Sequence, residues 1–234
     1  MSFGALIFDC DGVLVDTERD GHLVAFNQAF VDLGIDAHWS EALYDRLLQT
    51  GGGKERMTAY FDEFGWPAAH KDKQGLIAQL HKRKSEIFLD LIDQGKLTLR
   101  PGIARIIDEA ISAGLKLAVC STSKLESVQG CLALAGPERV QRFDRVLAGD
   151  IVSRKKPDPE IYNLASTELG VPPDACIVVE DSGIGCRAAV AAGMRTVITM
   201  SAFTRKERFE GAFLVTDELG DGPDQIALAA LMAR

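Results

Sequence analysis

The sequence predicts an α/β protein in which a doubly wound parallel sheet is interrupted by an inserted helical segment. Three observations predict this fold class. The apolar run Ala5-Leu6-Ile7-Phe8 indicates a short buried strand. Residues 18–95 carry only helical periodicity. From about residue 100, strand-like runs alternate with helical patterns, which is typical of a parallel sheet with helices on both faces.

The inserted segment is expected to contain helices and no strand. Its apolar residues recur at intervals of three and four, as one face of a helix requires. They are Leu23, Phe26, Phe30 and Leu33 in the first helix, Leu43, Leu47 and Leu48 in the second, Met57, Tyr60, Phe61 and Phe64 in the third, and Leu76, Leu80, Ile87 and Leu91 in the fourth. We therefore predict a core domain at 1–17 and 96–234 and a helical cap domain at 18–95.

The remaining core elements follow in order. Apolar runs predict strands at 115–120, 145–148, 176–179 and 196–199. Helical patterns lie between them, and Gly114, Gly170 and Gly193 are suited to end three of these helices. The alternation predicts that all these strands run parallel in one sheet.

Composition restricts the partners and the compartment. The formal net charge of −8 argues against a general nucleic-acid surface. No apolar run approaches the roughly 20 residues of a membrane span. The five cysteines lack paired spacing and are expected to be reduced, buried thiols. We therefore expect a cytoplasmic monomer without nucleic-acid or membrane partners.

Charged and hydroxyl-bearing residues recur where the predicted core strands finish, which is the edge at which open parallel sheets bind ligands. They are Asp9 and Asp11 after the first strand, Ser121 and Thr122 after the second, Lys155 and Lys156 after the third, and Glu180 and Asp181 after the fourth. Asp9 and Asp11 are two positions apart, so in an extended chain they would share a face. Helix capping or solvent exposure would explain each group alone, but not their meeting at one edge.

This combination of groups indicates phosphoryl transfer. The carboxylates of Asp9, Glu180 and Asp181 would repel one another unless a hard cation with oxygen ligands lay between them, and Mg²⁺ is the usual one. Nearby hydroxyls and a lysine suit a phosphate. A carboxylate that attacks a phosphate needs positive charge beside it because both groups are anions, and Mg²⁺ with Lys156 would supply that charge.

The same residues resemble the four signatures of the haloacid dehalogenase superfamily of Mg²⁺-dependent phosphatases. Asp9-Cys10-Asp11-Gly12-Val13 resembles the nucleophile motif, Ser121 the second motif, and Lys156 before Pro157 the third. Glu180-Asp181 with Ser182-Gly183-Ile184-Gly185 resembles the fourth. The resemblance covers the whole chain and implies a Rossmannoid core with the first strand central and a type I cap inserted after it.

The resemblance also implies a role for each matching residue. Asp9 would be the nucleophile that forms an aspartyl-phosphate. Asp11 would be the general acid for the leaving oxygen and then the base for water. The Mg²⁺ ligands would be Asp9, the backbone carbonyl of Asp11, Asp181, and Glu180 directly or through water. The phosphate would be held by Ser121, Thr122 and Lys156.

Within this superfamily, the chain most resembles the CbbY group, which dephosphorylates xylulose 1,5-bisphosphate, in its plant and cyanobacterial type. The stretches that carry this resemblance are 16–22, 51–57, 99–102 and 120–123. Lys54 and Arg56 follow a glycine-rich turn and oppose the dipole of the helix that it opens, which a bound second phosphate would explain. The alternative is an ordinary solvated helix face. Glu18 and His22 would contact the sugar hydroxyls, although a lone histidine is more often structural.

Other functions stay open at this point. A mutase such as β-phosphoglucomutase would share Asp9 and Asp11 and differ in whether the closed cap admits water. A phosphoglycolate phosphatase would share the same chemistry on another substrate. A signalling receiver, from a different class, also uses a phospho-accepting aspartate, but it normally carries that residue mid-chain in a shorter domain, unlike Asp9 here.

Overall fold

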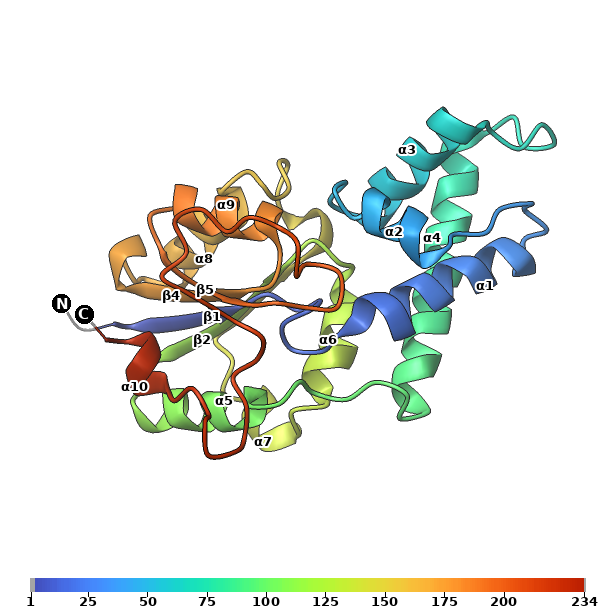
Figure 1. The fold of residues 1–234 in the computed structure, drawn as a ribbon. Helices are drawn as coiled ribbons and strands as arrows, with labels where there is room; N and C mark the ends of the chain where they lie inside the picture. Colours follow the sequence, from blue (N-terminus) through green and yellow to red (C-terminus); the bar gives the residue numbers. More distant parts are fainter. Residues whose placement is uncertain (1–2, 234) are drawn as a thin grey trace. The chain divides into compact units, whose positions relative to one another are not determined.

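The computed structural model describes residues 3–233, which form two compact units. One unit runs to Asp16 and resumes at Thr98, and the other is Thr17–Leu97 (Figure 1). The second unit lies wholly within the chain, so the polypeptide crosses between the units twice. Of the residues described, no helix combines the length and the apolar character needed to cross a membrane.

The first unit contains a six-stranded parallel sheet in the order β3-β2-β1-β4-β5-β6. Its strands are β1 (Ala5–Phe8), β2 (Lys116–Ser121), β3 (Arg145–Ala148), β4 (Cys176–Glu180), β5 (Arg195–Thr199) and β6 (Leu214–Thr216). The predicted fold class is confirmed, and β1 lies centrally between β2 and β4. The edge strand β6 was not predicted; it has only three residues, although Phe213, Leu214 and Val215 form a short apolar run.

Helices cover both faces of this sheet (Figure 1). They are α5 (Ile103–Ser112), α6 (Leu125–Ala133), α7 (Pro137–Val140), α8 (Glu160–Leu169), α9 (Gly183–Ala191) and α10 (Leu228–Leu231), with short 3-10 turns η2 (Gly149–Ile151) and η3 (Pro173–Ala175). Helices α8 and α9 lie on one face, and α5 and α6 lie on the other. The sheet is therefore buried on both sides, as the near-continuous apolar strands require.

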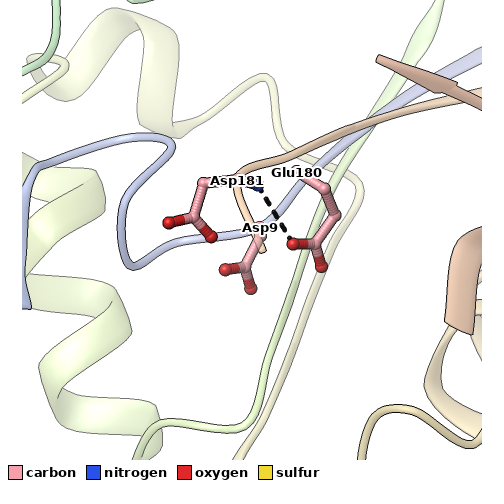
Figure 2. Close-up of side chains that lie close together, drawn as sticks. All are labelled: Asp9, Glu180 and Asp181. Carbon is pink, nitrogen blue, oxygen red and sulfur yellow. Dashed lines mark hydrogen bonds between the residues drawn. The ribbon is translucent and has the colours of Figure 1, made fainter. Parts of the chain in front are cut away.

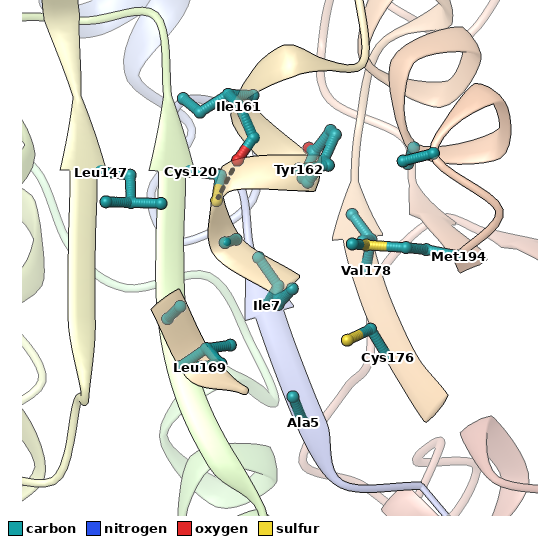
Figure 3. Close-up of a cluster of buried hydrophobic side chains, with 14 of the residues drawn as sticks. Ala5, Ile7, Cys120, Leu147, Ile161, Tyr162, Leu169, Cys176, Val178 and Met194 are labelled. Atoms are coloured by element: carbon teal, nitrogen blue, oxygen red, sulfur yellow. Dashed lines mark hydrogen bonds between the residues drawn. The ribbon is translucent and has the colours of Figure 1, made fainter. Parts of the chain in front are cut away.

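The core on the α8 and α9 side shows how the sheet positions polar groups. Ile7 of β1 and Val178 of β4 pack there against side chains such as Leu169 of α8 (Figure 3). Side chains two apart in a strand share a face. The next residues of the same parity are Asp9 and Glu180, so both carboxylates follow from the burial pattern of the strands that precede them.

The second unit is helical, as its periodicity predicts. Its elements are the π-helical turn η1 (Glu18–Leu23) and the helices α1 (Val24–Asp32), α2 (Glu41–Leu47), α3 (Gly53–Phe64) and α4 (Lys73–Asp93). The aromatic side chains of Phe26, Phe30 and Trp39 pack together in its interior. The Asn27 side chain bonds both the N–H and the C=O of Trp39, at 2.7 and 2.9 Å, and so fixes the connection from α1 to α2.

Two glycines with positive φ provide a matched test of packing at the start of α5. Gly102 (φ +86) precedes α5, and a Cβ there would lie 2.7 Å from the backbone of Gly220, whereas a Cβ at Gly114 (φ +73) would meet nothing within 4 Å. We expect Gly114→Ala to cost about 1 kcal/mol of unfolding free energy through backbone strain alone. Gly102→Ala should cost clearly more. Urea unfolding followed by circular dichroism measures both, and equal losses would contradict the packing explanation.

Candidate active site

Three buried carboxylates meet at the carboxyl ends of β1 and β4. One oxygen from each of Asp9, Glu180 and Asp181 lies within 4.8 Å of the others (Figure 2). The register that pairs Phe8 with Val179 brings the two strand ends level, and the Asp9 N–H donates to the Val179 carbonyl at 2.9 Å. The structure therefore brings together the three carboxylates that the sequence places at this edge.

Lys156 is the cation of this cluster. Its buried ammonium group donates to Asp9 Oδ1 at 2.8 Å, to Glu180 Oε1 at 2.6 Å and to the Cys120 carbonyl at 2.9 Å. Burial alone would lower the pKa of Lys156, but the Asp9 and Glu180 carboxylates raise it well above its ordinary value. The lysine is therefore charged at neutral pH. Its neighbour Lys155 instead forms an ion pair with Asp150 at 3.2 Å.

The cluster carries more negative than positive charge. Burial raises the pKa of Asp9 to about 8, and the nearby Glu180 and Asp11 carboxylates add to this effect while Lys156 opposes it. Three carboxylates around one ammonium group leave room in the charge balance for a divalent cation, and an all-oxygen donor set is what hard cations prefer. The residues of this structure thus fit a divalent metal ion.

Two glycines allow the carboxylates to lie against the backbone. A Cβ at Gly12, where φ is +77, would lie 2.1 Å from an Asp181 carboxylate oxygen. A Cβ at Gly185, in the first turn of α9, would lie 2.1 Å from both carboxylate oxygens of Glu180. Any side chain at either position would displace a carboxylate of the cluster, which is a physical reason for glycine in both motifs.

Tyr162 of α8 is a site residue that the sequence did not indicate. Its hydroxyl donates to Glu180 Oε1 at 2.5 Å, and its ring lies 5.0 Å from the Lys156 ammonium nitrogen. A tyrosine on the apolar face of a helix is ordinarily read as core, so the sequence contains no signal for this contact. Tyr162 and Lys156 together bind the same oxygen and hold the Glu180 side chain in place.

Ser121 at the end of β2 and Ser123 just after it make different hydrogen bonds. Ser121 is buried, and its Oγ accepts a hydrogen bond from the Ser123 N–H at 3.0 Å. Ser123 Oγ donates to Asp11 Oδ2 at 2.5 Å. Thr122 lies half-buried between them. Ser123 is a second residue of the site that sequence reasoning did not assign.

Asp9 and Asp11 have different surroundings, although the sequence pairs them. β1 ends at Phe8, and the Asp9 N–H still donates to the Val179 carbonyl. The chain turns directly after Asp9, where the Cys10 carbonyl accepts bonds from the N–H groups of Val13 and Leu14. The face-sharing rule for strands no longer applies beyond that point. As a result, Asp9 bonds Lys156 while Asp11 bonds Ser123, and the acidic cluster found within residues 3–233 does not include the Asp11 carboxylate.

In the second unit, two of the predicted residues form one charged group with Tyr44. Arg56 is buried; it donates to the Tyr44 hydroxyl at 2.8 Å and lies 3.9 Å from Glu18. The same hydroxyl donates to Glu18 at 2.5 Å. The alternative that Arg56 lies on an ordinary solvated helix face is therefore wrong. Lys54 is half-buried at the start of α3. Tyr44 was missed because it occupies an apolar helix position.

His22 is buried beside Lys84. The Lys84 ammonium group lies 2.9 Å from His22 Nδ1, and the imidazole packs on Phe88 with ring centroids 4.2 Å apart. An ammonium group can only donate, so Nδ1 is the acceptor in this contact. Lys84 could have been found in the sequence, because it interrupts the apolar stripe of Leu76, Leu80 and Phe88 at intervals of four.

The fold and the carboxylate cluster define a class of enzyme that the family comparison bears out. Residues 3–193 match the family model of haloacid dehalogenase-like hydrolases. The chain belongs to this family and is a hydrolase.

Its relatives include proteins of the CbbY group. The chain is 52% identical over 226 residues to the CBBY-like protein of Arabidopsis thaliana, covering 94% of this chain and 70% of that protein. It is 42% identical over 219 residues to Protein CbbY of Cereibacter sphaeroides, covering 93% of each. A crystal structure of a CbbY mutant from Rhodobacter sphaeroides in complex with xylulose 1,5-bisphosphate has a TM-score of 0.89 and 40% identity, covering 99% of this chain and 100% of that one.

The raised pKa of Asp9 gives a prediction for the metal-free protein. Because this pKa rises from 3.8 to about 8 on folding, the folded protein binds the proton more tightly than the unfolded chain. Asp9 therefore lowers stability by an amount that grows as the pH rises across that interval. In EDTA at about pH 8, Asp9→Asn should melt at a higher temperature than the wild type, and the difference should shrink toward about pH 5.

Thermal melts by circular dichroism measure this difference. The exposed Asp224→Asn removes the same charge and serves as the control, for which we expect no pH-dependent difference. A metal-free Asp9→Asn protein less stable than the wild type at the higher pH would contradict the raised pKa of Asp9 that burial and the neighbouring carboxylates cause.

Proposed function

We propose that this hydrolase is a Mg²⁺-dependent phosphatase that removes one phosphate from a small sugar phosphate, most specifically xylulose 1,5-bisphosphate. The observation that carries this proposal is the buried Lys156 between Asp9 and Glu180, with Ser121 at the neighbouring strand end. This arrangement offers a nucleophile, a fixed positive charge and a hydroxyl donor, which are the groups that phosphoryl transfer needs. We also propose that residues 1–17 and 96–234 form the catalytic domain and 18–95 the substrate-binding cap.

In the proposed reaction, a carboxylate oxygen of Asp9 attacks the phosphorus atom. An O–P bond to Asp9 forms while the bond between phosphorus and the sugar oxygen breaks, and Asp11 gives its proton to that oxygen. Water then attacks the phosphorus of the aspartyl-phosphate, the O–P bond to Asp9 breaks, and Asp11 takes a proton from the water. Inorganic phosphate leaves with the water oxygen, and both aspartates return to their starting states.

The surrounding residues would lower the cost of bringing two anions together. Lys156, Ser121 and Thr122 would bind the oxygens of the transferred phosphate. Mg²⁺ would be held by Asp9, Asp181 and the backbone carbonyl of Asp11, with Glu180 directly or through water. When bound, the ion would neutralise part of the charge on the nucleophile and on the phosphate.

The sugar-bisphosphate part of the proposal rests on the relatives and on the second unit. A related CbbY structure contains xylulose 1,5-bisphosphate. Here, Lys54 and Arg56 would bind the second phosphate, and Glu18 and His22 would contact the sugar. Arg56 is already held by Tyr44 beside Glu18, so its positive charge is fixed before a ligand arrives. A cytoplasmic monomer remains the prediction for the protein's state.

A panel of phosphorylated sugars tests the proposed activity. With Mg²⁺, we expect phosphate release from xylulose 1,5-bisphosphate with a kcat/KM at least about tenfold above that for 2-phosphoglycolate or hexose monophosphates. EDTA should abolish release, and so should Asp9→Asn, which keeps the shape of the side chain. Preference for another substrate would overturn the substrate assignment alone. Conversion of β-glucose 1-phosphate to the 6-phosphate without phosphate release would instead indicate a mutase.

Lys54 provides a test of the second phosphate site. Loss of one charge-assisted contact should raise KM for xylulose 1,5-bisphosphate by about tenfold or more in Lys54→Gln. Turnover of a sugar monophosphate should change little, because it lacks the second phosphate. Lys82→Gln, which removes an exposed lysine of α4, is the matched control. Equal effects on both substrates would place Lys54 outside a second phosphate site.

A further inference from the structure

Ser123 links the turns that follow two neighbouring strands. It lies in the short segment between the end of β2 at Ser121 and the start of α6 at Leu125. Its hydroxyl donates to Asp11 Oδ2 at 2.5 Å, and Asp11 lies in the turn after β1. This bond joins residues 112 positions apart in the sequence.

Helix capping does not explain this serine. Serine just before a helix usually bonds a free N–H group of the first turn. Here the N-cap residue of α6 is Lys124, and the helix has no side-chain capping bond. The Ser123 hydroxyl is directed to Asp11 instead.

The backbone of Ser123 is itself fixed in place. Its N–H donates to Ser121 Oγ at 3.0 Å. The turn after β3 lies nearby, since a Cβ on Gly149 would meet the Ser123 carbonyl oxygen at 3.6 Å, an ordinary contact distance. The bond to Ser121 therefore fixes the backbone from which the Ser123 hydroxyl reaches Asp11.

We propose that Ser123 is the positioning residue for the general acid and base of this enzyme. The hydroxyl occupies Oδ2 of Asp11, so the proton that passes to the sugar oxygen is carried on Oδ1. When the bond between phosphorus and the sugar oxygen breaks, that proton moves from Oδ1 to the leaving oxygen, and Oδ1 later accepts a proton from water. This inference rests on the role of Asp11 in the proposed function.

The leaving group provides the test. A sugar oxygen needs a proton to depart, whereas p-nitrophenolate departs as a stable anion. The parameter kcat/KM reports only on steps up to the loss of the leaving group. For Ser123→Ala we expect kcat/KM for xylulose 1,5-bisphosphate to fall by about tenfold or more, as misplacement of a general acid allows. With p-nitrophenyl phosphate it should change less than about threefold, because no general acid is needed.

Three further variants make the result interpretable. Ser123→Thr keeps a hydroxyl and should recover most of the lost kcat/KM. Ser127→Ala removes a nearby buried hydroxyl that has no hydrogen-bond partner among the described residues, and it should match the wild type with both substrates. Asp11→Asn should show the same selectivity for the leaving group, with a larger loss.

The outcomes separate the two hypotheses. Suppose that the loss of kcat/KM in Asp11→Asn depends on the leaving group, but Ser123→Ala lowers kcat/KM equally for both substrates or for neither. The proposed role of Ser123 is then overturned, and that of Asp11 stands. If Asp11→Asn shows no selectivity, the proposed role of Asp11 fails, and the inference about Ser123 fails with it.

Discussion

Lys156 holds two carboxylates, Asp9 and Glu180, with its ammonium group inside the protein. Buried ion pairs are poor sources of stability, because removing the charges from water costs about as much as their attraction returns. Here the balance is less favourable still, since the third carboxylate, Asp181, has joined the cluster. Three features of the fold hold the carboxylates together despite this cost: the strand ends are level, Gly12 and Gly185 leave room for the carboxylates, and Tyr162 donates a further hydrogen bond. The cluster therefore has room for additional positive charge, as a divalent cation would supply.

The sequence predicts the part of this site that depends on strands. An apolar run that ends in acids indicates both a buried strand and what stands at its end, so the strand pattern suffices to place Asp9, Glu180 and Asp181 at one edge. Prediction fails where the chain leaves regular structure. Because the chain turns directly after Asp9, the strand rule that puts Asp9 and Asp11 on one face does not hold. Contacts between distant residues, such as those of Tyr162 and Ser123, have no local signature at all.

In the second unit too, the sequence indicates a candidate functional residue but not its partners. A basic residue in the first turn of a helix is a visible anomaly, so Arg56 could be singled out by sequence. The partners of Arg56 could not be identified from the sequence, because Tyr44 lies on α2 and Glu18 begins η1. The pairing keeps a cation buried without leaving it unbalanced. A basic residue in the first turn of a helix can thus be neutralised by a side chain of its own unit, as Glu18 does for Arg56. The sequence alone cannot distinguish this pairing from neutralisation by a bound anion.

In the proposed mechanism, Asp9 and Asp11 are residues of one type with two different roles. Pairs of titratable groups whose environments differ are the usual basis for separate roles in acid and base chemistry. Asp9 is enclosed with a permanently charged lysine and two further carboxylates, an environment that binding of a cation would turn in favour of its anionic, nucleophilic form. Asp11 is half-buried and bonded to a neutral hydroxyl, which can accompany either protonation state. The turn that follows Asp9 separates these environments. In the proposed mechanism, the shape of the backbone, more than the identity of the side chains, would therefore assign the roles of nucleophile and proton carrier.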